Sequence, residues 1–99
     1  MCERFTDGKL NVPQAVAEGT PQNVEDMKDK LVEVTGGPFT CTFDVETSLD
    51  GVTWNLAINN INAPAAPQAV AALAKWMRVN MTAYTSGLPI VRVFGRTTR

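Results

Sequence analysis

Residues 36–54 read GGPFTCTFDVETSLDGVTW, and this stretch contains the clearest strand of the sequence. Within residues 39–48, polar side chains alternate with small or apolar ones at Phe39, Cys41, Phe43, Val45 and Thr47. A period of two is typical of a strand that buries one face. The sequence therefore predicts a central strand here, with Phe39 and Phe43 among the residues that determine the fold.

A turn and a returning strand follow directly. Asp50-Gly51 favours a turn, because glycine adopts positive φ at low cost and aspartate accepts hydrogen bonds from nearby backbone. Residues 52–58 then read as a return strand, in which Trp54 is large enough to help close a small core. Asp50, Gly51 and Trp54 are accordingly predicted to determine the fold as well.

The second half of the chain contains two further alternating segments. Residues 75–82 and residues 88–95 each predict a strand with one buried face, and Gly87 lies in the turn predicted between them. The inward side chains are expected to be those of Met77, Val79, Met81, Val91 and Val93.

The remaining segments complete a small domain. Residues 21–35 predict a hairpin with its turn near Lys28-Asp29, residues 59–67 a connection between layers, and residues 68–74 at most one short helix. Residues 1–20 are expected to form an N-terminal arm or strap with room for one edge strand, which leaves residues 21–99 for the sandwich domain. About six or seven mostly antiparallel strands joined by short turns favour an all-β, two-sheet sandwich.

Composition excludes several classes of function. The 99 residues hold 9 Lys and Arg against 10 Asp and Glu, so the basic balance typical of a nucleic-acid-binding protein is missing. No apolar run approaches the length of a membrane span, and the N-terminus lacks the pattern of a signal peptide, so we expect synthesis in the cytoplasm. Histidine is absent, which removes the commonest general base and metal ligand. We therefore expect one domain with no catalytic residues, no metal site and no cofactor.

Cysteines and paired carboxylates have simple explanations. Cys2 and Cys41 are expected to stay reduced, as cytosolic thiols do, rather than to form a disulfide. Asp44 and Glu46 share the outward face of one predicted strand, but a calcium or acid–base site needs further oxygen ligands or a second catalytic group. Both are therefore predicted to be ordinary solvated side chains. Asp50 is predicted to stabilise the turn that it forms with Gly51.

The last two strands suggest a protein interface. With a turn centred near residue 85, three outward pairs lie across from one another: Trp76 and Phe94, Arg78 and Arg92, Asn80 and Ile90. Opposed arginines need an acidic neighbour, which predicts that Asp44 or Glu46 lies close. An apolar patch with arginine beside it is typical of protein interfaces. The predicted interface is therefore Trp76, Arg78, Ile90, Arg92 and Phe94, unless residues 68–74 or the N-terminal arm cover this patch within one chain.

The order of four motifs resembles a known group of proteins. These are V-x-V-x-G at residues 32–36, G-x-F-T-x-T at 37–42, S-x-D-G-x-x-W at 48–54 and R-V-N-x-T-x-Y-T-S-G at 78–87. Their order resembles that of small, jelly-roll-like β-sandwich virion proteins of tailed bacteriophages. The resemblance implies that the matching positions determine the fold: Gly37, Phe39, Asp50, Gly51, Trp54, Arg78, Val79, Asn80, Tyr84 and Gly87.

This resemblance implies a structural function in the virion. Such proteins act as capsid cement or decoration proteins, or in head fibres and tails, often as trimers and without an active site. For residues 1–20 it implies an extended arm over a neighbouring capsid subunit. We therefore predict a virion structural protein, not an enzyme, that binds the major capsid protein or another virion protein and forms a homo-oligomer, with a trimer favoured. No nucleic-acid or membrane partner is expected.

A second function stays open at this point. The S-x-D-G-x-x-W segment also resembles discoidin-like carbohydrate-binding domains, and Trp76 is an outward aromatic residue placed to stack on a sugar. The alternative is therefore a sugar-binding module, or a tail or head-fibre component used in host attachment. An enzyme ranks third, because the sequence offers no compact set of nucleophile, base and oxyanion donors.

Overall fold

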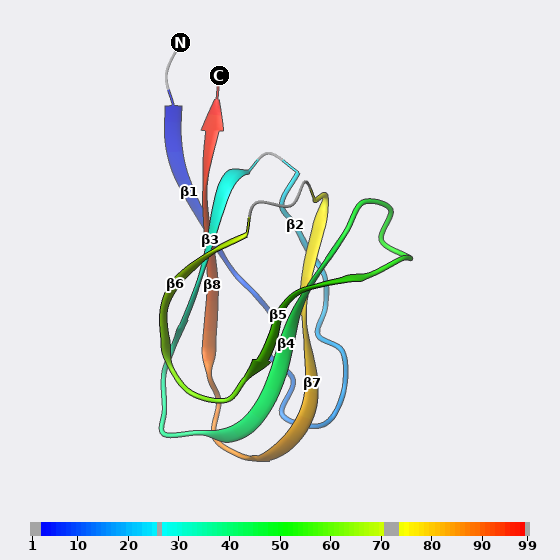
Figure 1. Cartoon of the computed structure of the whole chain (residues 1–99), viewed down its shortest axis with the longest axis vertical. Coiled ribbons are helices and arrows are strands. Elements are labelled where there is room, and N and C mark those ends of the chain that lie inside the picture. The colour runs from blue at the N-terminus through cyan, green and yellow to red at the C-terminus, as the bar shows by residue number, and fades with distance from the viewer. Residues whose placement is uncertain (1–2, 26, 71–73, 99) are drawn as a thin grey trace.

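The fold consists of two antiparallel sheets packed face to face (Figure 1). The computed structural model describes residues 3–25, 27–70 and 74–98. In the first sheet the strand order is β1 (Glu3–Lys9), β8 (Ile90–Thr98), β3 (Lys28–Thr35) and β6 (Ala65–Val70). In the second sheet it is β2 (Gln22–Asn23), β7 (Trp76–Ser86), β4 (Thr40–Ser48) and β5 (Asn55–Ile61). Within the described residues, no helix is long and apolar enough to cross a membrane.

The strand pairs follow the pattern of a long hairpin rolled up on itself. β1 pairs with β8, β2 with β7, β3 with β6 and β4 with β5, while β3·β8 and β4·β7 join these pairs into the two sheets. Eight strands in this arrangement form a jelly roll. The predicted all-β, jelly-roll-like sandwich is therefore confirmed. Of the described strands, β4 and β5 are the only consecutive ones that share a sheet.

The core lies between the inner faces of the two sheets. β4 contributes Cys41, Phe43 and Val45, and β7 contributes Met77, Val79 and Met81, all buried as the alternation predicted. The other sheet supplies the remaining side chains of the layer, chiefly Val32, Val34, Val91 and Val93. Phe39 precedes β4 and is half-buried against this core, whereas Phe43 is fully buried. Alternation in the sequence thus identified the buried faces of β4, β7 and β8.

Two predicted hairpins are wrong. β2 and β3 lie in different sheets, so residues 21–35 form a crossing between layers and not a hairpin. β7 and β8 also lie in different sheets, although their inward residues are those predicted. The predicted crossing at residues 59–67 does occur, because β5 belongs to the second sheet and β6 to the first.

The short helix predicted at residues 68–74 is not found where the structure describes this segment. Gln68, Ala69 and Val70 belong to strand β6, which pairs with β3, and Ala74 is buried beyond it. Residues 71–73 lie outside the described residues. Pro67 is tolerated within β6 because this is an edge strand, where a missing backbone donor need not break a ladder.

The N-terminal segment is built into the sandwich. Residues 3–9 form edge strand β1, which pairs with β8 along its whole length. Residues 10–21 then cross to the second sheet, where the backbone amides of Gly19 and Met81 form hydrogen bonds with the carbonyls of Val79 and Ala17. The segment predicted to be an arm or strap with room for one edge strand therefore contains such a strand and contacts both sheets of its own chain.

Two crossings pack against each other at one end of the sandwich. A Cβ on Gly87, which has a φ of 87°, would lie 2.6 Å from Cα of Phe39, in the crossing between β3 and β4. The Tyr84 hydroxyl donates a hydrogen bond of 2.8 Å to the Gly87 carbonyl, and Pro89 just beyond is buried. This packing gives a physical role to the Y-T-S-G motif.

Candidate functional site

The predicted interface is divided between opposite faces of the molecule. Trp76 and Arg78 lie on the outer face of β7 in the second sheet, whereas Ile90, Arg92 and Phe94 lie on the outer face of β8 in the first. The predicted cross-strand pairs do not form, because β7 pairs with β2 and β4 while β8 pairs with β1 and β3. The five residues therefore form two separate groups, one on each outer face, and not one interface.

Arg78 is the centre of a cluster on the second sheet, formed by Arg78, Trp54, Glu46 and Glu18. Its Nε donates a hydrogen bond of 2.8 Å to Oε1 of Glu46, and its Nη2 lies 3.1 Å from Oε2 of Glu18. Its guanidinium carbon lies 4.1 Å from the centre of the Trp54 ring, which is a cation–π contact. The Arg78 cluster therefore ties the N-terminal crossing, β4 and the segment before β5 to β7.

Two predictions are resolved by this cluster. A carboxylate does neighbour Arg78, and it is Glu46. Asp44 has another role, since its Oδ1 accepts a hydrogen bond of 2.8 Å from the backbone of Asn60. The prediction that Trp54 closes the core is wrong, because Trp54 is half-buried on the outer side, where Arg78 covers one face of its ring.

The β4–β5 loop, residues 49–54, projects from the body of the sandwich (Figure 1). Its turn is held by the predicted residue, because Oδ1 of Asp50 accepts hydrogen bonds of 2.8 Å from the amides of Val52 and Thr53. The hydroxyl of buried Ser48 donates to the same Oδ1 and accepts from the Gly51 amide. The hydrogen bonds from Thr53, Val52 and Ser48 lower the pKa of Asp50, so its carboxylate is charged at neutral pH.

Large apolar side chains are exposed on and beside this loop. Val52 is 81% exposed, Leu49 is 60% exposed and Leu56, at the start of β5, is 56% exposed. Scattered single apolar residues are ordinary on protein surfaces, but three within eight positions on a projecting segment are typical of an interaction site. The β4–β5 loop is therefore the candidate contact element of this face.

The first sheet carries a hollow lined by outward and buried side chains of β3, β6 and β8. This β3–β8 hollow has a volume of about 370 Å³ and is lined by Asp29, Lys30, Leu31, Ala69, Val70, Phe94, Gly95 and Arg96. Leu31 lies directly across from Phe94 on β8 and from Ala69 on β6, so an apolar row crosses three strands. Lys30 is only 3% exposed, and burial lowers its pKa although Asp29 partly opposes the shift.

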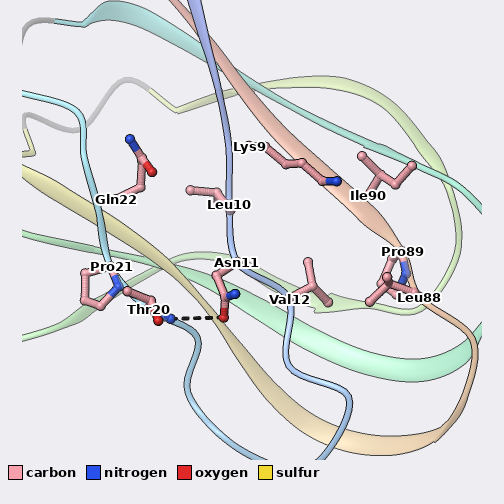
Figure 2. Close-up of a pocket in the computed structure, with 10 residues that line it drawn as sticks. All are labelled: Lys9, Leu10, Asn11, Val12, Thr20, Pro21, Gln22, Leu88, Pro89 and Ile90. Atoms are coloured by element: carbon pink, nitrogen blue, oxygen red, sulfur yellow. Dashed lines mark hydrogen bonds between the residues drawn. The ribbon is translucent and has the colours of Figure 1, made fainter.

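A second pocket, of about 540 Å³, lies where the N-terminal crossing meets the start of β8 (Figure 2). Three segments line it: residues 9–12, 20–22 and 88–90. Asn11 and Thr20 face each other across the mouth, where Oδ1 of Asn11 accepts a hydrogen bond of 3.3 Å from the Thr20 amide. The lining contains a lysine, two carboxamides and one hydroxyl but no carboxylate or thiol. The lining therefore offers hydrogen-bonding groups and one positive charge but no acid–base pair.

Metal-ligating side chains are dispersed over the described residues. No three Asp, Glu or Cys side chains in residues 3–25, 27–70 and 74–98 lie close enough together to hold a metal ion. Cys41 has a free thiol in the core, and burial raises its pKa, which disfavours the reactive thiolate.

With the surfaces described, the chain can be compared with known proteins. No family model and no curated protein sequence matches it. One solved fold is similar. It is the crystal structure of the SPBc2 prophage-derived protein YomS, with a TM-score of 0.76 over 98% of this chain and 96% of that chain, at 8% sequence identity. At this identity the similarity concerns the fold, and it agrees with the two-sheet architecture described above.

Sequence reasoning missed the two concave surfaces for one reason. The Figure 2 pocket joins segments that are up to 81 positions apart, from residue 9 to residue 90, and the β3–β8 hollow joins three strands from both halves of the chain. The exposed side chains of the β4–β5 loop had a local signal, because Leu49 and Val52 flank a turn that keeps both out of the strands.

Proposed function

We propose that this chain is a non-enzymatic structural protein of a bacteriophage particle, of the capsid cement or decoration type, which acts by protein–protein contact. The observation that carries the proposal is the projecting β4–β5 loop, with Leu49 and Val52 exposed on a backbone fixed by Asp50. The similarity of the fold to the prophage-derived protein YomS supports a phage context.

The loop suits a cement role on energetic grounds. Burial of one Val or Leu side chain contributes about 1.5 to 3 kcal/mol, so two or three such side chains provide a useful but modest contact. Because the hydrogen bonds of Asp50 already order the loop, little conformational entropy is lost on binding. Modest contacts of this kind, repeated between the many copies of a protein in a particle, stabilise the particle by multivalency.

The composition of the described surfaces favours protein binding over catalysis. The chain has no histidine, and the lining of the Figure 2 pocket contains no carboxylate or thiol. Catalysis of group transfer needs a nucleophile beside a base, and the lining of the Figure 2 pocket offers no such pair.

The test is the protein composition of purified particles. Particles of the phage or prophage that encodes this chain are purified on a density gradient, and the chain is quantified against the major capsid protein by mass spectrometry. We expect many copies per particle, and particles that lack the chain should lose their contents at a lower temperature. Absence of the chain from particles, despite its synthesis in the same cells, would overturn the proposal.

The sugar-binding alternative is separated by a glycan array. Trp54 and Trp76 are both half-buried on the second sheet, so an aromatic surface for a sugar is available there. Binding of the folded protein to a defined glycan, lost in Trp76→Ala while particle incorporation is unchanged, would favour host attachment over the cement role.

A further inference from the structure

The chain carries both a projecting apolar element and a concave apolar surface, on different sides of the molecule. The β4–β5 loop presents Val52, 81% exposed, with the carboxylate of Asp50 two positions away. The β3–β8 hollow presents the apolar row of Leu31, Phe94 and Ala69. Apolar tips of this kind are buried in partner pockets at protein interfaces.

The charges of the two surfaces are complementary. Lys30 and Arg96 line the hollow against one carboxylate, Asp29, which leaves one net positive charge. The loop carries one negative charge, that of Asp50, within residues 49–54. Because Lys30 is buried and its pKa is lowered, its ammonium group is poorly solvated, and a carboxylate placed beside it would be stabilising.

We propose that the partner of the β4–β5 loop is the β3–β8 hollow of a second copy of this chain, with Val52 and Leu49 seated against Leu31, Phe94 and Ala69. This inference rests on the proposed function and names the partner of the same loop. The contact is heterologous, because each copy contributes different surfaces to it, and heterologous contacts form closed rings when the rotation between copies closes.

The positions of the two surfaces favour a ring over a filament. In Figure 1 the loop projects sideways near the middle of the long axis, and the start of β3 and the end of β6, which line the hollow, lie at about that level and slightly toward the end at which the two termini emerge. A rotation about an axis along the molecule therefore carries one surface to the level of the other without a translation. In such a ring every loop and every hollow is occupied, and the remaining surfaces, the Figure 2 pocket included, stay available for the coat protein.

The test uses one variant for each half of the contact. Val52→Lys places a positive charge against the positive hollow and so disables the loop while it keeps the hollow, whereas Ala69→Asp, at an exposed position of edge strand β6, disables the hollow and keeps the loop. The full chain and each variant are measured by light scattering at concentrations up to about 1 mM, which populates contacts with a Kd in that range. Urea midpoints verify that the variants are folded, and Leu31→Ser replaces Ala69→Asp if that variant is not.

A heterologous contact makes a specific prediction for the mixture. The unmodified chain should have the mass of a closed ring of several 10.7 kDa chains, and each variant alone should have the mass of one chain. An equimolar mixture should form a 1:1 dimer and nothing larger, because one intact loop and one intact hollow remain between the two variants. A mixture that stays monomeric, or an unmodified chain that stays monomeric, would overturn the inference.

Two matched variants control for charge and for the other pocket. Val16→Lys changes another exposed apolar side chain, 67% exposed, away from the loop, and Leu88→Asp changes the Figure 2 pocket, where Leu88 is 47% exposed. Both should assemble like the unmodified chain. If Leu88→Asp is monomeric and Ala69→Asp still assembles, the loop binds the Figure 2 pocket and the inference is wrong. Particles that contain a chain monomeric in solution would overturn this inference alone, whereas rings absent from particles would overturn the proposed function alone.

Discussion

The β4–β5 loop and the crossing from β7 to β8 each follow a long strand and each contain a glycine with positive φ, yet they lead to different places. The loop, residues 49–54, returns the chain to the same sheet and leaves Leu49 and Val52 exposed. The crossing, residues 87–89, carries the chain to the opposite sheet and buries Pro89. The loop is held by hydrogen bonds of Ser48 and Asp50, and the crossing by contact with Phe39.

This difference indicates that the crossing serves the stability of the fold and that the loop serves binding. Hydrogen bonds among neighbours in sequence shape the turn of the loop, and Trp54 at its end stacks on Arg78, so Leu49 and Val52 need no packing of their own and remain available to a partner. The crossing depends on residues from another part of the chain, so its substitution should affect stability first. Substitutions in the crossing should therefore lower stability first, whereas substitutions of the exposed apolar side chains of the loop should disrupt assembly first.

The largest expected effect is at Gly87. In Gly87→Ala the new Cβ would lie 2.6 Å from Cα of Phe39 and 2.8 Å from the Pro38 carbonyl oxygen, at a φ of 87°. Strain at positive φ and overpacking together should lower the free energy of unfolding by about 2 to 4 kcal/mol, measured by urea denaturation. Gly51→Ala is the matched control, because Gly51 has a φ of 79° but a Cβ there meets only the Trp76 side chain, at 3.5 Å. Its loss should be about 1 to 2 kcal/mol, and equal losses would contradict the account.

The next effect concerns the anchor of the loop. Arg78→Met removes the cation–π contact with Trp54 and leaves Glu46, 16% exposed, without its partner. We expect a loss of about 1 to 3 kcal/mol in the free energy of unfolding.

Arg92→Met is the matched control for Arg78→Met. Arg92 also contacts an aromatic ring and a glutamate, but its side chain is 43% exposed, and its buried Nε has no hydrogen-bond partner among the described residues. Solvent screens this pair, and the substitution removes an unsatisfied donor, so the loss should be about 0 to 1 kcal/mol. A larger loss at Arg92 than at Arg78 would disprove the anchoring role.

A smaller effect is expected at Tyr84. Tyr84→Phe removes the hydroxyl that donates to the Gly87 carbonyl at 2.8 Å and changes little else. The free energy of unfolding should fall by about 1 kcal/mol, with an unchanged dependence on urea concentration. The mass in solution should not change, because Tyr84 supports the crossing and not the loop. A change in mass with unaltered stability would show instead that Tyr84 supports assembly and not the crossing.

The smallest effect is the pH dependence of the loop. The folded-state pKa of Asp50 is lowered by the amides of Thr53 and Val52 and by the Ser48 hydroxyl. Its contribution to stability is therefore fully present above the unfolded pKa of about 3.9 and is lost as the pH falls through the folded value. The difference in urea midpoint between the unmodified chain and Asp50→Asn should shrink below about pH 4. A difference that is constant over this range would show that the carboxylate charge has no part in holding the loop.

From the sequence we could predict which side chains of a strand point inward, but not which strands lie beside one another. Alternation identified Phe43, Val79 and Val93 as inward because side-chain orientation depends on each strand alone. It also placed Trp76 and Phe94 outward, and both are on outer faces. They were wrongly assigned to one patch because a short turn after β7 suggested a hairpin, whereas the rolled arrangement sends β8 to the other sheet.

Local chemistry was predicted better than long-range contact at the candidate site. The role of Asp50 depends on residues within three positions, so its turn was predictable. Asp44 or Glu46 was predicted to neighbour the arginines, and of the two Glu46 binds Arg78. The stacking of Trp54 on Arg78 and the β3–β8 hollow were not predictable, because both depend on which strands become neighbours in space.

Amide hydrogen exchange of the unmodified chain at two concentrations would show whether the β4–β5 loop binds the β3–β8 hollow of another copy. At high concentration we expect protection to increase in residues 49–54 and in the segments of the hollow, residues 29–31 and 94–96, while residues 87–89 keep the same protection. Exchange that is independent of concentration in residues 49–54, or added protection confined to the outer face of β7 around Trp76, would contradict the account.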